Sequence, residues 1–232
     1  MSKTTEIITK VQSEKRTALL ETEAKMICED YDIPVTKFKL AKNEQEAIEF
    51  AQEIGYPIVL KIVSPDIIHK SDAGGVKVNL KTEEEVKNAY NQILKNAKNY
   101  SQNAEIKGIL VQEMAPQSTE VIIGSVKDPT FGQTVMFGLG GVFVELLKDV
   151  TFRLAPVAEY DALEMIKELK AYPLLKGFRN NPTVDIDSLV NIILKTSNLI
   201  MEHSEIKEAD LNPVMAYEKG AKTVDARIIL EA

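Results

Sequence analysis

The stretch that decides the fold is GYPIVLKIVSPDIIHKSDAGGVKVNL, residues 55–80. Its first part, residues 56–63, is a nearly continuous run of apolar, mostly branched residues, which is typical of a buried strand. A polar loop follows and contains His69, one of only two histidines in the chain. Two adjacent glycines then lead into a second strand that ends near residue 80. The stretch therefore predicts a buried strand, a loop that carries a histidine, and a second strand.

The composition limits the classes of protein to consider. The chain has 232 residues, of which 44% are hydrophobic, which suits one large domain or two small subdomains. A net charge of −7 argues against general binding to nucleic acid or membrane surfaces, which requires a basic footprint. We see no secretory signal, and the longest uncharged apolar run, residues 135–144, is too short to span a bilayer. The single cysteine, Cys28, favours a reducing cytoplasm.

The N-terminal half alternates between helical and extended patterns. Residues 1–19 are polar, with a loose helical pattern but without a clear apolar stripe, and we expect a terminal arm. A helix is expected over 23–31 with Thr22 as its N-cap, followed by a strand over 34–41. Asn43 is expected to cap a helix that Gly55 ends, and Thr82 with Glu85 to form a capping box for a helix over 83–97.

The C-terminal half begins with three closely spaced strands. They cover 108–114, 120–126 and 134–139, and their spacing predicts an antiparallel meander. Asp161 with Glu164 is expected to cap a helix that ends near residue 172, and a long amphipathic helix follows over 186–201. The final segment reads as a hairpin with its tight turn at Lys219-Gly220. The fold class is α+β (mixed α/β), with subdomains over 20–112 and 113–232.

His69 is the first candidate for chemistry. An unperturbed imidazole is largely neutral at pH 7 and is a ready nucleophile. Gly74 and Gly75 would let backbone N–H groups approach an anion such as phosphate. The alternatives are a solvated loop histidine and a strained glycine turn, and the residues alone leave them open.

Lys61 lies inside the apolar strand, where an unpaired ammonium group is costly to bury. A phosphate is one candidate partner, and the alternative is a lysine whose stem is buried while its charge reaches water. Glu113 and Glu120 lie near strand ends, where they could contact a nucleotide. A second glycine loop, FGLGG, leads toward Glu145.

A second polar set lies near the C-terminus. Asp210 and Asn212 in DLNPV alternate onto one face of a strand, and Asp225 in VDARI falls across the hairpin. Carboxylate and amide oxygens suit Mg²⁺ that also binds phosphate oxygens. The alternative is a polar sheet edge.

These segments together resemble one family. GYPIVLKIVSPDIIHKSDAGGV, VQEM, DPTFGQTVMFGLGGVFVELLKDVTFRLAPV and DLNPV…VDARI follow one another in the order found in the ATP-grasp beta subunits of ADP-forming acyl-CoA synthetases. The resemblance runs from about residue 20 to the end of the chain. It implies an ATP-grasp fold of two subdomains and the reaction acyl-CoA + ADP + phosphate ⇌ acid + ATP + CoA.

The resemblance also implies roles for single residues. His69 matches a phosphorylated histidine that passes its phosphoryl group to ADP, and Asp210 matches the acid that steadies it. Lys61 matches the lysine that meets nucleotide phosphates. Asn212 and Asp225 match the Mg²⁺ positions, and Glu113 lies in the segment that lines the adenine pocket.

The resemblance further implies a CoA-binding alpha subunit, which would make an α2β2 assembly with this chain or be fused to it. One departure is Asn180, which stands where the family usually has glycine. Two rival interpretations remain: another ATP-grasp ligase that forms acyl phosphate directly, and a regulatory nucleotide-binding module. A direct ligase needs no nucleophilic histidine, and a regulatory module could lose His69 without consequence.

Overall fold

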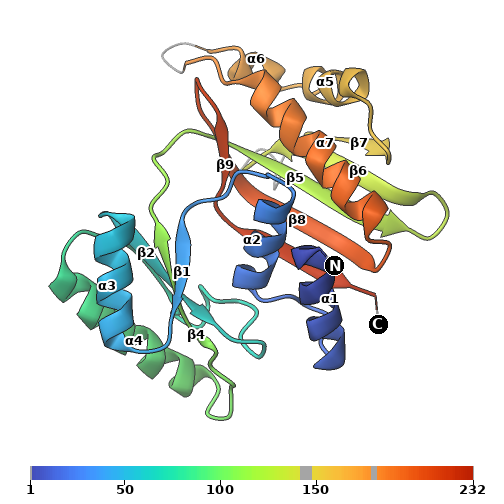
Figure 1. The fold of residues 1–232 in the computed structure, drawn as a ribbon. Coiled ribbons are helices and arrows are strands. Elements are labelled where there is room, and N and C mark those ends of the chain that lie inside the picture. The colour runs from blue at the N-terminus through green and yellow to red at the C-terminus, as the bar shows by residue number, and fades with distance from the viewer. Residues whose placement is uncertain (1, 142–147, 179–181, 232) are drawn as a thin grey trace. The chain divides into compact units, whose positions relative to one another are not determined.

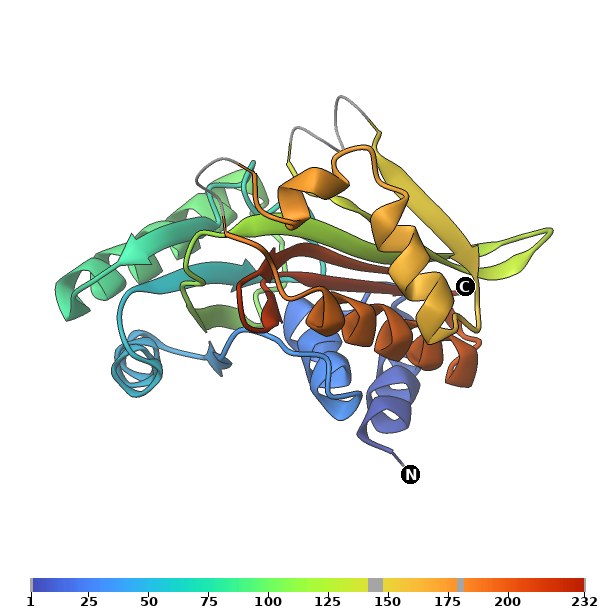
Figure 2. The same ribbon diagram turned by 90° about the horizontal axis from the view of Figure 1, so that it is seen from above.

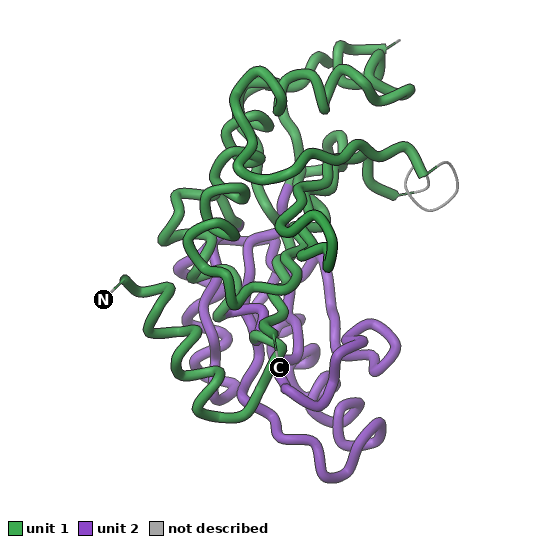
Figure 3. Tube along the Cα trace, turned by 90° about the vertical axis from the view of Figure 1, so that its right-hand side faces the viewer, with its two compact units in different colours: residues 1–19, 23–35, 116–232 green, residues 20–22, 36–115 purple. Residues whose placement is uncertain are grey.

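The computed structural model describes residues 2–141, 148–178 and 182–231. They form two compact units (Figure 3). Unit 1 comprises residues 1–19, 23–35 and 116–232, and unit 2 comprises residues 20–22 and 36–115. The expected division at residues 112–113 lies close to the boundary between residues 115 and 116. The expected arm differs, because residues 1–19 belong to unit 1 together with the C-terminal half of the chain.

Unit 2 is built on a four-stranded antiparallel sheet with the strand order β1-β4-β2-β3. Two helices, α3 and α4, pack against it and share one hydrophobic core with its strands. The elements are β1 Phe38–Ala41, α3 Glu44–Ile54, β2 Ile58–Val63, β3 Val76–Leu80, α4 Glu83–Tyr100 and β4 Gly108–Glu113.

The helix starts of unit 2 follow from side-chain caps, as the sequence predicts. The side chain of Asn43 accepts a hydrogen bond from the N–H of Glu46, and that of Thr82 accepts one from the N–H of Glu85. Gly55 ends α3 with a φ of 96°, which a side chain would disfavour. These local signals fix where both helices lie along the chain.

Strand β2 is buried along its whole length. Successive side chains of a strand point to opposite faces, so Ile58, Leu60 and Ile62 face the core shared with α3 and α4. Lys61 therefore points to the opposite face of the sheet. The prediction of a buried strand is confirmed, and its apolar continuity reflects burial on both faces.

Unit 1 contains a six-stranded antiparallel sheet with the order β10-β8-β5-β6-β7, and β9 pairs with β8. Its strands are β5 Thr119–Asp128, β6 Gly132–Leu139, β7 Val150–Leu154, β8 Ile206–Ala216, β9 Ala221–Thr223 and β10 Ala226–Leu230. Its helices are α1 Lys3–Ser13, α5 Glu159–Lys167, α6 Tyr172–Leu175 and α7 Ile186–Glu202, with most of α2 Glu21–Asp30.

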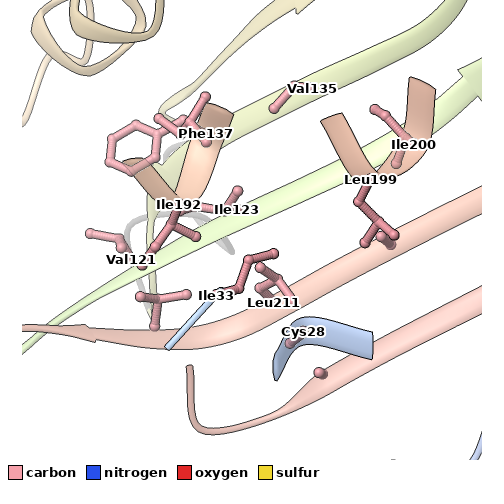
Figure 4. Packing of buried hydrophobic residues seen from close by; sticks show 14 of the residues in the cluster. Cys28, Ile33, Val121, Ile123, Val135, Phe137, Ile192, Leu199, Ile200 and Leu211 are labelled. Carbon is pink, nitrogen blue, oxygen red and sulfur yellow. The ribbon is translucent and has the colours of Figure 1, made fainter. Parts of the chain in front are cut away.

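Helix α7 runs along one face of this sheet (Figures 1 and 2). Ile192, Leu199 and Ile200 of α7 pack against the inward residues of β5, β6 and β8 (Figure 4). Successive side chains of β5 point to opposite faces of the sheet. Val121 and Ile123 point into the core, so Ile122 between them points to the other face. That other face of the sheet carries the polar residues of β8.

Residues 1–19 are not a loose arm. Helix α1 buries Thr4, Ile7, Ile8 and Val11 at helical spacing, and the three apolar residues join the core of unit 1. Ser2 caps the helix by accepting a hydrogen bond from the N–H of Thr5. The expectation of an arm was wrong because a narrow apolar stripe among polar residues was overlooked.

The expected meander of three strands is also wrong. Strand β4 pairs with β1 and β2 in unit 2, whereas β5 and β6 pair with each other in unit 1. Residues 108–112 are buried, and Ile109 and Val111 of β4 belong to the core of unit 2. Short spacing in sequence does not decide which sheet a strand joins.

Two helix starts differ from expectation. Helix α2 begins at Glu21, so Thr22 lies inside the helix and is not its N-cap. Helix α5 begins at Glu159 after Ala158 without a side-chain cap, and it ends at Lys167, separate from α6. The long helix at 186–201 is confirmed, with Asp185 as its N-cap. Among the described residues, no helix is both long and apolar enough to cross a membrane.

Candidate functional site

His69 is an exposed residue on the segment of unit 2, residues 64–75, that joins β2 to β3. The side chain of Asp66 accepts a hydrogen bond from the N–H of Glu105 at 2.6 Å, which holds the start of the segment. The side-chain amide of Asn96 donates to the carbonyl oxygen of Gly74 at 2.9 Å, which holds its end. The histidine is thus presented to solvent between two fixed points.

The two glycines shape the end of this segment. Gly74 has a φ of 60°, and a Cβ atom there would lie 2.7 Å from the Asn96 side chain. A Cβ atom on Gly75 would lie 2.5 Å from Ile62, so the segment returns closely over β2. The N–H groups of Gly74 and Gly75 donate to the carbonyl oxygens of Ser71 and Lys70. A phosphate cradle made from these N–H groups would require this turn to open.

Lys61 is neither unpaired nor directed to water. Its ammonium group donates to Oε1 of Glu21 at 2.7 Å, and Lys70 donates to Oε2 of the same carboxylate at 2.7 Å. The Glu21 side chain is 1% exposed, that of Lys61 8%, and that of Lys70 23%. One buried carboxylate therefore joins a lysine of β2 to the residue that follows His69. The alternative in which Lys61 reaches water is wrong.

Neither Glu21 nor Lys70 was predicted as a site residue. Glu21 precedes Lys61 by forty positions, so nothing in the local pattern relates them. The available signal was indirect, because a lysine within a buried strand requires an anionic partner. The chain itself supplies that partner.

Glu113 ends β4, and its Oε1 accepts a hydrogen bond from the N–H of Lys37 at 3.0 Å. Glu120 lies near the start of β5, where it is exposed. A Cβ atom on Gly140 would lie 2.9 Å from the Cβ of Glu120, so the glycine loop passes close to it. Glu145, expected at the end of that loop, and Asn180 lie outside the described residues.

Asp210 and Asn212 share one face of β8, as their alternation predicts. Both line a hollow of about 420 Å³ on the face of the unit 1 sheet away from α7. Apolar side chains from four strands form much of its wall, with Arg227 of β10 beside them. The apolar side chains are Ile122, Val126, Met136, Phe152 and Ile229. The hollow combines apolar cover with a small polar group, as small-molecule sites commonly do.

The environment of Asp210 perturbs its titration. Burial raises the pKa of this carboxyl above its ordinary value, and the negative charges of Asp225 and Glu208 raise it further. The Arg227 guanidinium acts in the opposite direction and lowers that pKa. Arg227 lies directly opposite Asp210 in the pairing of β10 with β8. A carboxyl group held in a desolvated, crowded position is a common property of functional sites.

The residues expected to bind Mg²⁺ fit that ion in their chemistry. The N–H of Asn212 donates to the carbonyl oxygen of Asp225 at 3.1 Å, which keeps the two residues side by side. They offer amide and carboxylate oxygens, which Mg²⁺ prefers. The described residues contain no group of three or more His, Cys, Asp or Glu side chains that could hold a metal.

The expected site residues thus form two groups. His69, Lys61, Gly74, Gly75 and Glu113 lie in unit 2, and Asp210, Asn212, Asp225 and Glu120 lie in unit 1. Within unit 2, a shared carboxylate links Lys61 to the His69 segment. Within unit 1, Asp210 and Asn212 lie in the middle of β8, and Asp225 is hydrogen-bonded to Asn212.

Comparison with known proteins places these features in one family. The model of the ATP-grasp domain matches residues 10–230. The beta subunit of the ADP-forming acetate–CoA ligase I of Pyrococcus furiosus is 55% identical over 230 residues, which cover 99% of each chain. The chain belongs to the ATP-grasp family of ADP-forming acid–CoA ligase beta subunits.

Longer members of this family contain the same domain. The ADP-forming 4-hydroxybutyrate–CoA ligase of Nitrosopumilus maritimus is 50% identical over 98% of this chain, which corresponds to 33% of that protein. The beta-subunit domain therefore occurs both as a separate chain and within a larger one.

Solved structures of the acetyl-coenzyme A synthetase 1 of Ca. Korarchaeum cryptofilum are also similar. A complex with coenzyme A, acetyl-coenzyme A and a phosphorylated phosphohistidine segment in the site I orientation has a TM-score of 0.93 and 55% identity. A complex with coenzyme A and Mg-AMPPCP has the segment pointing towards the nucleotide-binding site, with a TM-score of 0.88 and 52% identity. Both matches cover 98% of this chain and 100% of the other.

Proposed function

We propose that the chain is the nucleotide-binding beta subunit of an ADP-forming acid–CoA ligase and carries a phosphoryl group on His69. The observation that carries the proposal is the exposed histidine on a segment joined through one carboxylate to Lys61. Identity of 55% over nearly the full length of a ligase beta subunit supports it. The overall reaction is acyl-CoA + ADP + phosphate ⇌ acid + ATP + CoA.

The chemistry assigned to this chain is two phosphoryl transfers. In the first, a ring nitrogen of His69 attacks the phosphorus of a phosphoryl group carried by the alpha partner, so a P–N bond forms as the bond to the donor breaks. In the second, a β-phosphate oxygen of ADP attacks phosphorus, and the His69 P–N bond breaks to leave ATP. Such transfers depend mainly on positioning and charge compensation.

Lys61 would supply part of that compensation in unit 2. Its ammonium group is a positive charge in unit 2 that donates a hydrogen bond to Glu21, and such a charge can compensate phosphate oxygens. Glu21 holds the lysine in a buried position, where an ammonium group interacts strongly with phosphate. Glu113, at the end of β4, is proposed to line the adenine pocket.

Asp210 is proposed to be the acid that steadies the phosphohistidine. A carboxylate that accepts a hydrogen bond from one imidazole nitrogen orients the ring and increases the nucleophilicity of the other nitrogen. Arg227, opposite Asp210, opposes the pKa increase and favours its ionised form.

Asn212 and Asp225 would hold Mg²⁺, and Glu120 would lie beside the nucleotide. When bound, the ion neutralises charge on the nucleotide phosphates during transfer. We propose an alpha partner that binds CoA and forms the acyl phosphate, because the Pyrococcus furiosus relative is itself the beta subunit of its ligase. That partner is a separate subunit or a fused domain in the proposed enzyme.

The test is labelling of the full chain with Mg²⁺ and γ-labelled ATP, alone and with its alpha partner. We expect a label that is acid-labile, base-stable and mapped to His69. His69→Ala should remove it, while His203→Gln, at the other histidine of the chain, should retain it. An acid-stable label, or one that persists in His69→Ala, would contradict the proposal.

A further inference from the structure

Glu21 joins two functional parts of unit 2. Each oxygen of its carboxylate accepts a hydrogen bond at 2.7 Å, one from Lys61 of β2 and one from Lys70 of the His69 segment. All three residues belong to unit 2 (Figure 3). With its side chain only 1% exposed, the carboxylate is shielded from water, so both ion pairs are stronger than surface pairs.

Lys70 occupies a special place along the segment. The segment is held at its start by Asp66 and at its end by Gly74, as the contacts with Glu105 and Asn96 show. Lys70 directly follows His69 between these two points, so its ion pair acts where the histidine is presented. Breaking this pair would free the middle of the segment without releasing its ends.

The histidine segment of a close relative is found in more than one orientation. In the Korarchaeum enzyme it is recorded in the site I orientation in one complex and pointing towards the nucleotide-binding site in another. A segment that takes two positions requires contacts that hold it in each of them and can be exchanged. An ion pair with one partly exposed member suits this role, because water can replace the lost contact.

We propose that Glu21 is a positioning residue that holds the His69 segment beside Lys61, on the nucleotide side, through Lys70. This inference rests on the proposed function, since it takes Lys61 to be the lysine that meets nucleotide phosphates. When the segment leaves, Lys70 gives up Oε2 of Glu21 while Lys61 keeps Oε1. The nucleotide site is thus preserved while the histidine moves.

A different role for Lys70 would be direct contact with the phosphoryl group on His69. The two roles differ in their dependence on Glu21. If Lys70 acts through Glu21, replacing Lys70 has no further effect once Glu21 has lost its charge. If Lys70 contacts phosphate directly, its replacement is equally harmful in both backgrounds.

The first experiment measures amide hydrogen exchange of the full chain without nucleotide. Ala73, Gly74 and Gly75 donate hydrogen bonds inside the segment, so their exchange reports its opening. We expect Lys70→Met to speed this exchange about tenfold, which corresponds to one charge-assisted hydrogen bond. Lys70→Arg should restore slow exchange, because arginine keeps the charge.

Matched variants separate this effect from general loss of stability. Lys39→Met removes a more exposed ion pair, with Glu53, in the same unit and should leave the segment unchanged. In the Glu21→Gln background, Lys70→Met should add no further increase. Wild-type exchange in Lys70→Met, or a full additional increase in the Glu21→Gln background, would overturn the inference.

The second experiment measures the initial rate of His69 labelling from ATP with the alpha partner present. Lys70→Met should lower that rate about tenfold, with unchanged affinity for Mg·ADP, because Lys61 keeps its pairing with Glu21. An equal loss of nucleotide affinity would overturn the positioning role. If the wild-type chain takes no label, the proposed function fails, whereas the exchange result still decides whether Glu21 holds the segment.

Discussion

Replacement of Glu21 by glutamine should destabilise unit 2 far more than a surface substitution would. The change keeps the size of the side chain but removes the charge that faces Lys61 and Lys70. Lys61 is 8% exposed, so its ammonium group would remain buried without this carboxylate. Removing one partner of a buried pair costs about 3–5 kcal/mol. The remaining amide oxygen can still accept one hydrogen bond, so we expect about 3 kcal/mol, the lower end of that range.

The double variant Glu21→Gln/Lys61→Met tests the reason for this cost. Methionine fills the volume of the lysine stem without its charge, so the buried ammonium disappears with the carboxylate. Replacing a buried pair by neutral groups of similar volume is often close to neutral. Lys70, at 23% exposure, can turn to water when its partner is lost. We therefore expect the double variant to lose only about 1 kcal/mol, mainly from that partly exposed pair.

The assay is native-state hydrogen exchange of the β2 amides, which reports the opening of unit 2 separately from unit 1. Urea unfolding followed by circular dichroism gives the same order of stabilities if the chain unfolds as a whole. A free energy of opening within 0.5 kcal/mol of wild type for Glu21→Gln would refute the reasoning. So would a double variant that is less stable than Glu21→Gln alone.

Three further predictions concern unit 1. Asp210→Asn should raise the free energy of unfolding at pH 7, because burial raises the folded-state pKa of this carboxyl and its ionised form is disfavoured by folding. The gain in the free energy of unfolding should vanish at acid pH, where the carboxyl is protonated in both the folded and the unfolded state. Urea titrations at several pH values measure it, and a gain that increases toward acid would contradict the prediction. Asp225→Ala should weaken binding of Mg·ADP by about tenfold or more, measured by calorimetry, since it removes a charged oxygen ligand; unchanged affinity would remove it from the metal site. Ile8→Ala should cost about 2–4 kcal/mol, because Ile8 is buried at the contact of α1 with the core. Thr9→Ala, on the exposed face of the same helix, should stay within about 0.5 kcal/mol of wild type.

Local signals in the sequence predicted much of the fold. The caps at Asn43 and Thr82 and the long helix α7 lie where side-chain chemistry and periodicity placed them. Such features depend on residues within a few positions of one another. Strand β4 shows the limit, because its pairing with β1 and β2 depends on which surfaces need cover across the whole unit.

The same distinction applies to the site. Asp210 and Asn212 share a face because alternation along a strand is a local rule, and both line the hollow of unit 1. The partner of Lys61 could not be read from the sequence, since Glu21 lies far away along the chain. The sequence did show that a lysine in an apolar strand requires an anion. It could not show that the protein provides one.

The central claim is that His69 hands its phosphoryl group to ADP. The most direct measurement is a chase of the chain after labelling and removal of free nucleotide. On addition of Mg·ADP, we expect the label to leave His69 and appear as ATP in a stoichiometric amount. A label that stays on His69, or that appears as inorganic phosphate while ADP remains unchanged, would contradict the account.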